Sequence, residues 1–158
     1  ISQQTDLPRD EGAKFIEGYF SKYPGIKGYL DGMKEEVKKT GYLETVCGRR
    51  RYIPEVNSPN YQIRQAAERM AVNMPIQGTA ADIVKIAMIN IDHAMTRKQL
   101  RSRMILQVHD ELIFEVPKDE ITTMLEIVQE LMPGALDLSV PLKVEIKTGT
   151  NWGSLDSL

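Results

Sequence analysis

The sequence predicts an α+β fold, in which an antiparallel sheet containing a β-hairpin packs against helices. Apolar residues recur at helical spacing in long blocks, and these blocks are separated by short β-branched segments that end in turn residues. Helices mixed with hairpins and a separate strand are typical of a layered α+β arrangement. With 158 residues, of which 42% are hydrophobic and 27% charged, the chain fits one soluble domain or a large piece of one.

The first part of the chain is expected to contain two helices and a small hairpin. Pro8 opens a helix that ends at Lys22, and Pro24 opens a second helix that Gly41 terminates. Two short alternating segments follow on either side of a Cys-Gly turn, and we expect them to form strands over 42–46 and 49–54.

The second part is expected to contain helices, a larger hairpin and a closing strand. Residues 57–60 signal a loop that can cap the next helix, which begins near Tyr61. Pro75 should interrupt and kink that helix, and helical spacing resumes from Ile76 to Thr96. The remaining elements are a hairpin, an amphipathic helix and a strand, over 103–116, 118–132 and 140–148.

The hairpin segment is the most informative part of the sequence, because two apolar runs flank His109, Asp110 and Glu111. A tight turn between the runs would place adjacent carboxylates at the edge of a sheet. Adjacent acids repel, and Mg²⁺, which prefers hard oxygen ligands, would relieve that repulsion. From these three residues alone, an exposed polar turn without a ligand is an equally good interpretation.

Charge is distributed unevenly along the chain, although the net charge is only −2. Five arginines lie between Gly48 and Met70, at Arg49, Arg50, Arg51, Arg64 and Arg69. The acids gather between Asp110 and Glu130, and we interpret those from Asp119 onward as the solvated face of one helix. A basic region for phosphates and a separate acidic region for a metal would produce this pattern.

A polar helix face offers a second candidate site. Arg69, Asn73 and Gln77 are spaced four residues apart, so they project from one side of a helix. Their side chains can reach base edges and sugar-phosphate oxygens. Taken alone, such a face is more often simply solvated.

The two candidate sites together resemble one known family. The segments Arg69–Asp82 and Gln107–Leu112, in this order, resemble the C-terminal third of the polymerase domain in family A DNA polymerases, the bacterial DNA polymerase I type. The basic segment Gly48–Pro54 resembles the turn that precedes these motifs in the family. The resemblance covers essentially the whole chain.

The resemblance implies a segment of a DNA-directed DNA polymerase, which transfers nucleotides from dNTPs to a primer 3′-OH with two Mg²⁺ ions. It implies that Asp110 is the metal-binding palm carboxylate, that the adjacent Glu111 is a further candidate metal ligand, and that His109 lies by the primer 3′ end. The implied DNA-binding residues are Arg69, Asn73, Gln77, Gln107, Arg49, Arg50, Arg51 and Arg64.

The resemblance also implies an incomplete site. Residues 1–56 would be a distal fingers segment and residues 57–158 the C-terminal half of the palm. Because the chain starts at Ile1 rather than Met, we expect a segment of a longer protein. A first catalytic Asp strand, the dNTP-binding fingers helix and the thumb would lie elsewhere, so we expect the isolated chain to be inactive.

The expected partners are primer-template DNA, dNTP and the remaining polymerase segments. No apolar stretch is long enough to cross a bilayer, so we expect no membrane partner. The single cysteine cannot form an internal disulfide, which favours a cytoplasmic location. A non-catalytic module that binds duplex DNA is the alternative function, and the intact His109–Asp110–Glu111 set favours the polymerase.

Overall fold

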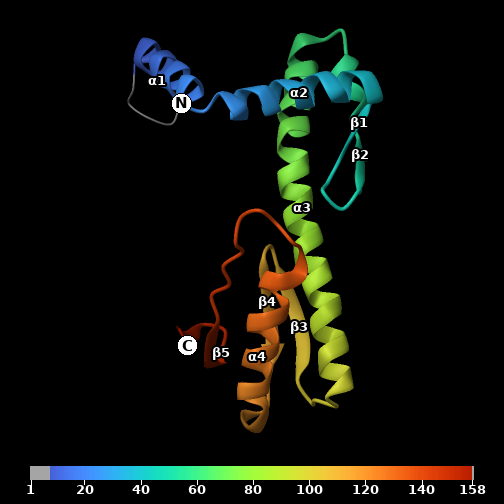
Figure 1. Cartoon of the computed structure of the whole chain (residues 1–158), viewed down its shortest axis with the longest axis vertical. Helices are drawn as coiled ribbons and strands as arrows, with labels where there is room; N and C mark the ends of the chain where they lie inside the picture. The colour runs from blue at the N-terminus through green and yellow to red at the C-terminus, as the bar shows by residue number, and fades with distance from the viewer. Residues whose placement is uncertain (1–7, 158) are drawn as a thin grey trace. The chain divides into compact units, whose positions relative to one another are not determined.

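The computed structural model describes residues 8–157 and confirms the mixed fold of helices and antiparallel strand pairs (Figure 1). The elements are α1 (Arg9–Lys22), α2 (Pro24–Thr40), β1 (Tyr42–Glu44), β2 (Arg50–Tyr52), η1 (Pro54–Asn57), α3 (Tyr61–Arg97), β3 (Arg103–Val108), β4 (Glu111–Glu115), η2 (Lys118–Glu120), α4 (Ile121–Leu131), η3 (Pro133–Ala135), β5 (Lys147–Asn151) and β6 (Ser154–Ser157). The described strands form three separate antiparallel pairs, β1–β2, β3–β4 and β5–β6. The chain divides into two compact units, with the boundary between Ile76 and Gln77 inside α3.

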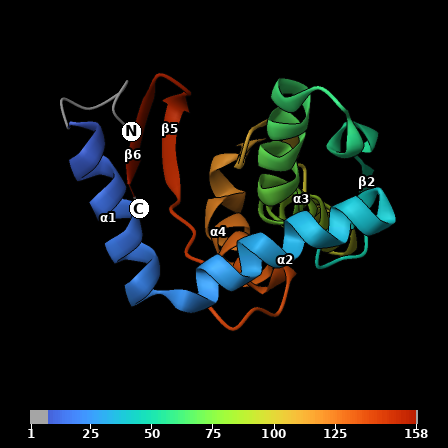
Figure 2. The ribbon, with the colours of Figure 1, turned by 90° about the horizontal axis from the view of Figure 1, so that it is seen from above.

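Helices α1 and α2 begin and end where the sequence predicts. The backbone N–H of Tyr23 bonds to the carbonyl of Tyr19 at 2.9 Å, which closes α1, and Pro24 opens α2 as a separate helix (Figure 2). Gly41 ends α2 in the left-handed conformation, with φ 76°, and its N–H bonds to the carbonyl of Val37. A glycine adopts this conformation at little cost, so the stop is encoded locally.

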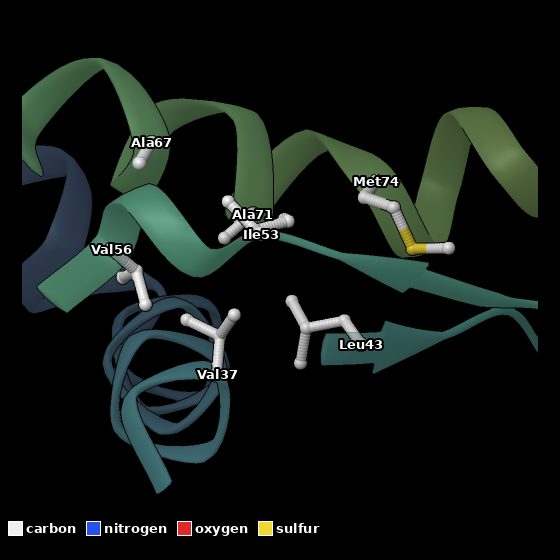
Figure 3. Close-up of a cluster of buried hydrophobic side chains, with 7 residues drawn as sticks. All are labelled: Val37, Leu43, Ile53, Val56, Ala67, Ala71 and Met74. Carbon is white, nitrogen blue, oxygen red and sulfur yellow. The ribbon is translucent and has the colours of Figure 1, made fainter. Parts of the chain in front are cut away.

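The core of the first unit lies between α2, the β1–β2 hairpin and the start of α3 (Figure 3). Val37, Leu43, Ile53 and Val56 are each at most 1% exposed. The cluster consists of Val37, Leu43, Ile53, Val56, Ala67, Ala71 and Met74. Small residues on α3 let the other elements approach that helix closely. The predicted strand pair is confirmed, although β2 ends at Tyr52 because Pro54 starts the turn η1.

Helix α3 runs without interruption from Tyr61 to Arg97, so the predicted division at Pro75 is wrong. Asn60 caps its start as predicted, because the Asn60 Oδ1 accepts the backbone N–H of Gln62 at 2.9 Å. Proline removes a single backbone donor, and buried neighbours such as Met74 hold the helix through that position. Among residues 8–157, neither α3 nor any shorter helix has an apolar stretch sufficient to cross a membrane.

The second unit packs the β3–β4 hairpin against α4 and the later part of α3 (Figure 1). Its buried residues are Ala87, Ile91, Ala94, Met95, Met124 and Ile127. Met104, Leu112 and Phe114 extend from the hairpin onto this cluster. The predicted hairpin and the predicted amphipathic helix are both confirmed, the latter with a 3-10 first turn.

The predicted closing strand over 140–148 is wrong. Residues 140–146 form no strand, and the structure instead has a short hairpin, β5–β6, after them. The apolar alternation is real, because Leu142, Val144 and Ile146 are half-buried while Lys143 and Glu145 are exposed. A strand also needs a backbone partner, and the described part of the chain pairs nothing with residues 140–146.

Candidate functional site

The tip of the β3–β4 hairpin is a two-residue turn. Val108 pairs with Glu111, so His109 and Asp110 form the loop between the strands. His109 has a positive φ of 55°, which is uncommon for a residue other than glycine. The side-chain amide of Gln107 donates to the carbonyl of His109 at 3.0 Å and so ties the strand end to the turn. A side chain and the strand register together hold the turn.

The tip exposes His109, Asp110 and Glu111 to solvent, in line with their predicted position. Two adjacent carboxylates offer the hard oxygen ligands that suit Mg²⁺. Within residues 8–157, however, no group of three His, Cys, Asp or Glu side chains could hold a metal ion together. The donor chemistry at the tip therefore fits part of a divalent-metal site, and the described residues do not complete it.

Glu120 departs from the prediction for the acidic helix, because it is buried and not part of a solvated face. The residue is 8% exposed, and its carboxylate accepts the backbone N–H of both Arg101 and Ser102 at 2.9 Å. The Ser102 hydroxyl, which donates to the same carboxylate at 2.6 Å, is the main cause of a Glu120 pKa lowered to about 2. This residue lies beside the open end of the hairpin, opposite the tip.

Four of the five predicted basic residues of the first unit, Arg49, Arg50, Arg51 and Arg64, interact with neighbours. Arg50 Nε donates to Glu44 at 2.6 Å and its guanidinium lies 4.6 Å from the centre of the Tyr42 ring. The hydrogen bond to Glu44 is the main reason that the pKa of Arg50 is raised. Arg51 donates to the Met70 sulfur at 3.1 Å. Arg64 donates to the backbone carbonyl of Ser58 at 2.9 Å, and Arg49 also has an interaction partner.

Helix α3 carries Arg69, Asn73 and Gln77, and all three residues are exposed. Among the described residues, no hydrogen bond or ion pair holds Arg69, so its guanidinium is open to a ligand. Arg69 and Asn73 belong to the first compact unit, together with the basic hairpin. Gln77 belongs to the second unit, together with Gln107 and the acidic tip.

The chain matches the family model described as DNA polymerase family A over residues 1–154. It is 49% identical to the DNA polymerase I of Bacillus subtilis (strain 168) and 47% identical to that of Geobacillus stearothermophilus. Both matches extend over 152 residues, 96% of this chain, and the chain spans 17% of the length of each relative.

A solved structure, the POL domain of Pol1 from M. smegmatis in complex with DNA primer-template and dNTP, is similar with a TM-score of 0.86. The sequences are 48% identical, and the match covers 90% of this chain and 25% of that one. Family model, sequence relatives and structure agree. The chain belongs to DNA polymerase family A.

Proposed function

We propose that the chain is the C-terminal part of the polymerase domain of a DNA-directed DNA polymerase, which adds nucleotides from dNTPs to a primer 3′-OH. The exposed His109–Asp110–Glu111 tip, in a chain of family A, is the observation that carries the proposal. The similar POL domain was solved with DNA primer-template and dNTP, and these are the partners that we propose for this chain.

Asp110 is proposed as the principal metal-holding carboxylate, since it lies in the turn at the end of the strand pair and is exposed. Glu111 supports it from the first position of β4, and His109 would lie near the primer end. When bound at a complete site, Mg²⁺ ions polarise the attacking hydroxyl and stabilise the charge of the leaving group. The part that this chain contributes is to hold the carboxylates at the end of a hairpin that packs on the core of the second unit.

The DNA-binding role is proposed for the exposed polar side chains of α3 and the basic residues of the first unit. Arg69, Asn73 and Gln77 carry donors that suit minor-groove acceptors, which differ little between base pairs. The arginines at positions 49, 50, 51 and 64 would contact phosphates. Gln107 would lie near the same DNA surface, although its amide also supports the turn at His109.

The division into residues 1–56 as distal fingers and 57–158 as palm is likewise a proposal. The first seven residues of that fingers segment lie outside the described residues. The boundary between the compact units falls later, inside α3, because the start of α3 packs on α2 and the β1–β2 hairpin.

We further propose that other polymerase segments must complete the site. Two-metal transfer places the ions roughly 3.5–4 Å apart and needs more carboxylates than the tip provides. Among the described residues, no group of three His, Cys, Asp or Glu side chains could hold a metal ion together, and the chain matches 17% of its relatives' length. The isolated chain is therefore expected not to extend a primer.

A non-catalytic duplex-DNA-binding module is the second candidate. It is favoured by one observation, the incomplete metal site of the described residues. A binding module would retain the function of Arg69 and Asn73 but would have no use for the charge of Asp110. The effect of removing that charge therefore distinguishes the two candidates.

The test uses a hybrid polymerase in which this chain replaces the matching 152 residues of the Bacillus subtilis enzyme. Single-turnover nucleotide incorporation is measured with Mg²⁺. Because metal ions contribute several kcal/mol to transition-state stabilisation, we expect Asp110→Asn to lower the rate by roughly 10³-fold or more. The control is Asp92→Asn, which removes the same charge from an exposed position on α3.

We expect the rate of the control variant to stay within about twofold of the parent hybrid. An Asp110→Asn hybrid that keeps its rate would contradict the proposal. A folded hybrid that binds DNA but incorporates nothing, even with Asp110 present, would instead support the non-catalytic module.

A further inference from the structure

The open end of the β3–β4 hairpin is joined by one buried carboxylate. Arg101 and Ser102 lie immediately before β3, and Glu120 lies a few residues after the end of β4. One oxygen of Glu120 accepts the backbone N–H and the Nε of Arg101, at 2.9 and 3.2 Å. The other accepts the backbone N–H and the hydroxyl of Ser102, at 2.9 and 2.6 Å. We call these three residues the clasp.

Arg101 and Ser102 supply hydrogen-bond donors to both oxygens of the buried Glu120 carboxylate. Four donors surround the carboxylate, and Arg101 also pairs with the exposed Asp119. Hydrogen bonds to a charged group are stronger than those between neutral groups, and their loss leaves buried partners unsatisfied. The low pKa of Glu120 agrees with this geometry, because the donors favour the ionised form. At neutral pH the clasp is therefore charged and closed.

The hairpin needs such a constraint, because its register decides where the tip residues lie. A pairing irregularity between Met104 and Leu106 places an additional residue, Ile105, in β3. A slip by one residue would move every side chain to the opposite face and would displace Asp110 from the turn. Met104, Leu112 and Phe114 favour one register through their packing on the core of the second unit. The clasp adds a constraint at the open end of the hairpin, where the hydrogen bonds of two strands alone would give limited protection against a slip.

We propose that Glu120 is a positioning residue, which fixes the register of β3 against β4 and thereby the location of Asp110 and Glu111. The clasp holds the chain just before β3 and just after β4, so it defines which residues can pair at Arg103 and Glu115. The additional residue Ile105 and the turn at His109 and Asp110 then follow at fixed positions along the strands. This inference rests on the proposed function only in assigning a role to the tip carboxylates.

Three variants separate the charge from the shape of the clasp. Glu120→Gln keeps the size of the side chain but turns one acceptor oxygen into an NH₂ group that faces donors. Ser102→Ala removes one of the four hydrogen bonds and leaves the carboxylate. The matched control is Asp119→Asn, which removes an adjacent exposed charge that also pairs with Arg101 but lies outside the buried clasp.

Amide hydrogen exchange of the 158-residue chain at neutral pH is the first measurement. We expect Glu120→Gln to accelerate exchange in β3 and β4 by about tenfold or more, and Ser102→Ala to have a smaller effect. Amides of α2 and β1 should not change, and Asp119→Asn should stay within about twofold of the parent throughout. Cross-strand contacts between Gln107 and Leu112 report the register directly.

Nucleotide incorporation by the hybrid polymerase is the second measurement, with rates expressed per active site. A merely structural role would lower the amount of folded enzyme, whereas a positioning role lowers kcat with little change in the KM for dNTP. Unchanged hairpin exchange in Glu120→Gln would overturn the inference, as would a loosened hairpin with an unchanged kcat. If Glu120→Gln does not fold, Ser102→Ala decides between the same outcomes.

A failure of the proposed function gives a different result. In that case the hybrid with Glu120 intact is already inactive, while the exchange measurement still shows whether the clasp sets the register.

Discussion

Asp110 and Glu111 are neighbours in sequence but differ in backbone context. Asp110 lies in the turn, whereas Glu111 already belongs to β4 and its backbone is paired with Val108. In the hybrid polymerase we therefore expect a smaller loss of incorporation rate for Glu111→Gln than for Asp110→Asn. His109→Ala should be milder still, because it alters placement of the primer end and leaves both carboxylates. Single-turnover rates rank the three variants, and a Glu111→Gln loss that exceeds that of Asp110→Asn would reverse our assignment.

Arg69 is the basic residue whose role in binding is easiest to test, since no described neighbour holds its guanidinium. We expect Arg69→Ala to weaken binding of primer-template DNA. If Arg69 contacts a phosphate, the slope of the logarithm of the binding constant against the logarithm of the salt concentration should fall in magnitude by about 1. Lys118→Ala, which removes the same charge from the exposed surface of η2, is the control. Binding isotherms at several salt concentrations measure both effects, and equal slopes for Arg69→Ala and the control would place the DNA elsewhere.

At the residue level, the sequence predicted the tip but not its support. Two apolar, β-branched segments on either side of a short polar break at His109 and Asp110 are a local signal for a turn, so the tip could be located directly. Glu120 stands among other acids at the start of a helix, where a solvated charge is the usual meaning. Its burial depends on Arg101 and Ser102, which lie 19 and 18 residues away along the chain. A contact between residues so far apart along the chain leaves no pattern in the local sequence.

Among the elements, the β1–β2 hairpin depends on Leu43, which is 1% exposed. We expect Leu43→Ala to lower the free energy of unfolding of the first unit by about 2–5 kcal/mol, because it leaves a cavity between α2 and α3. Val46→Ala in the same hairpin is the control, since Val46 is 69% exposed and should cost roughly 0.5 kcal/mol or less. Urea unfolding measures both variants, and equal losses would show that this core does not hold the hairpin.

The clasp makes the stability of the second unit depend on pH. Glu120 has a pKa lowered from 4.5 to about 2, so the folded state favours its ionised form. This contribution is fully present above about pH 4.5 and is lost as the pH falls toward 2. We expect the difference in unfolding free energy between the parent chain and Glu120→Gln to shrink over this range. Urea unfolding at a series of pH values measures it, and a constant difference would contradict the role of the charge.

Two elements show why local patterns were insufficient. A proline inside a helix favours a break or a kink, because it removes one backbone hydrogen bond. At Pro75 the buried packing of α3 outweighs that loss. Residues 140–146 have the side-chain alternation of a strand, yet a strand also requires a paired backbone, which a sequence pattern does not report. The helix ends at Gly41 and Asn60 were predictable, because each depends on a residue next to the end itself.

Across the whole molecule, the described residues place an acidic tip in one compact unit and a basic hairpin in the other. The sequence predicted both regions from the distribution of charge, and the family follows from the comparisons. The described part of the chain holds no complete metal site, which makes completion by other segments the central claim of the proposed function.

Primer extension by the isolated chain and by the hybrid polymerase, under identical Mg²⁺ and primer-template conditions, tests this claim most directly. We expect the hybrid to incorporate the templated nucleotide and the isolated chain to give no product above a metal-free control. Templated extension by the isolated chain, or no extension by a folded hybrid that binds DNA, would contradict it.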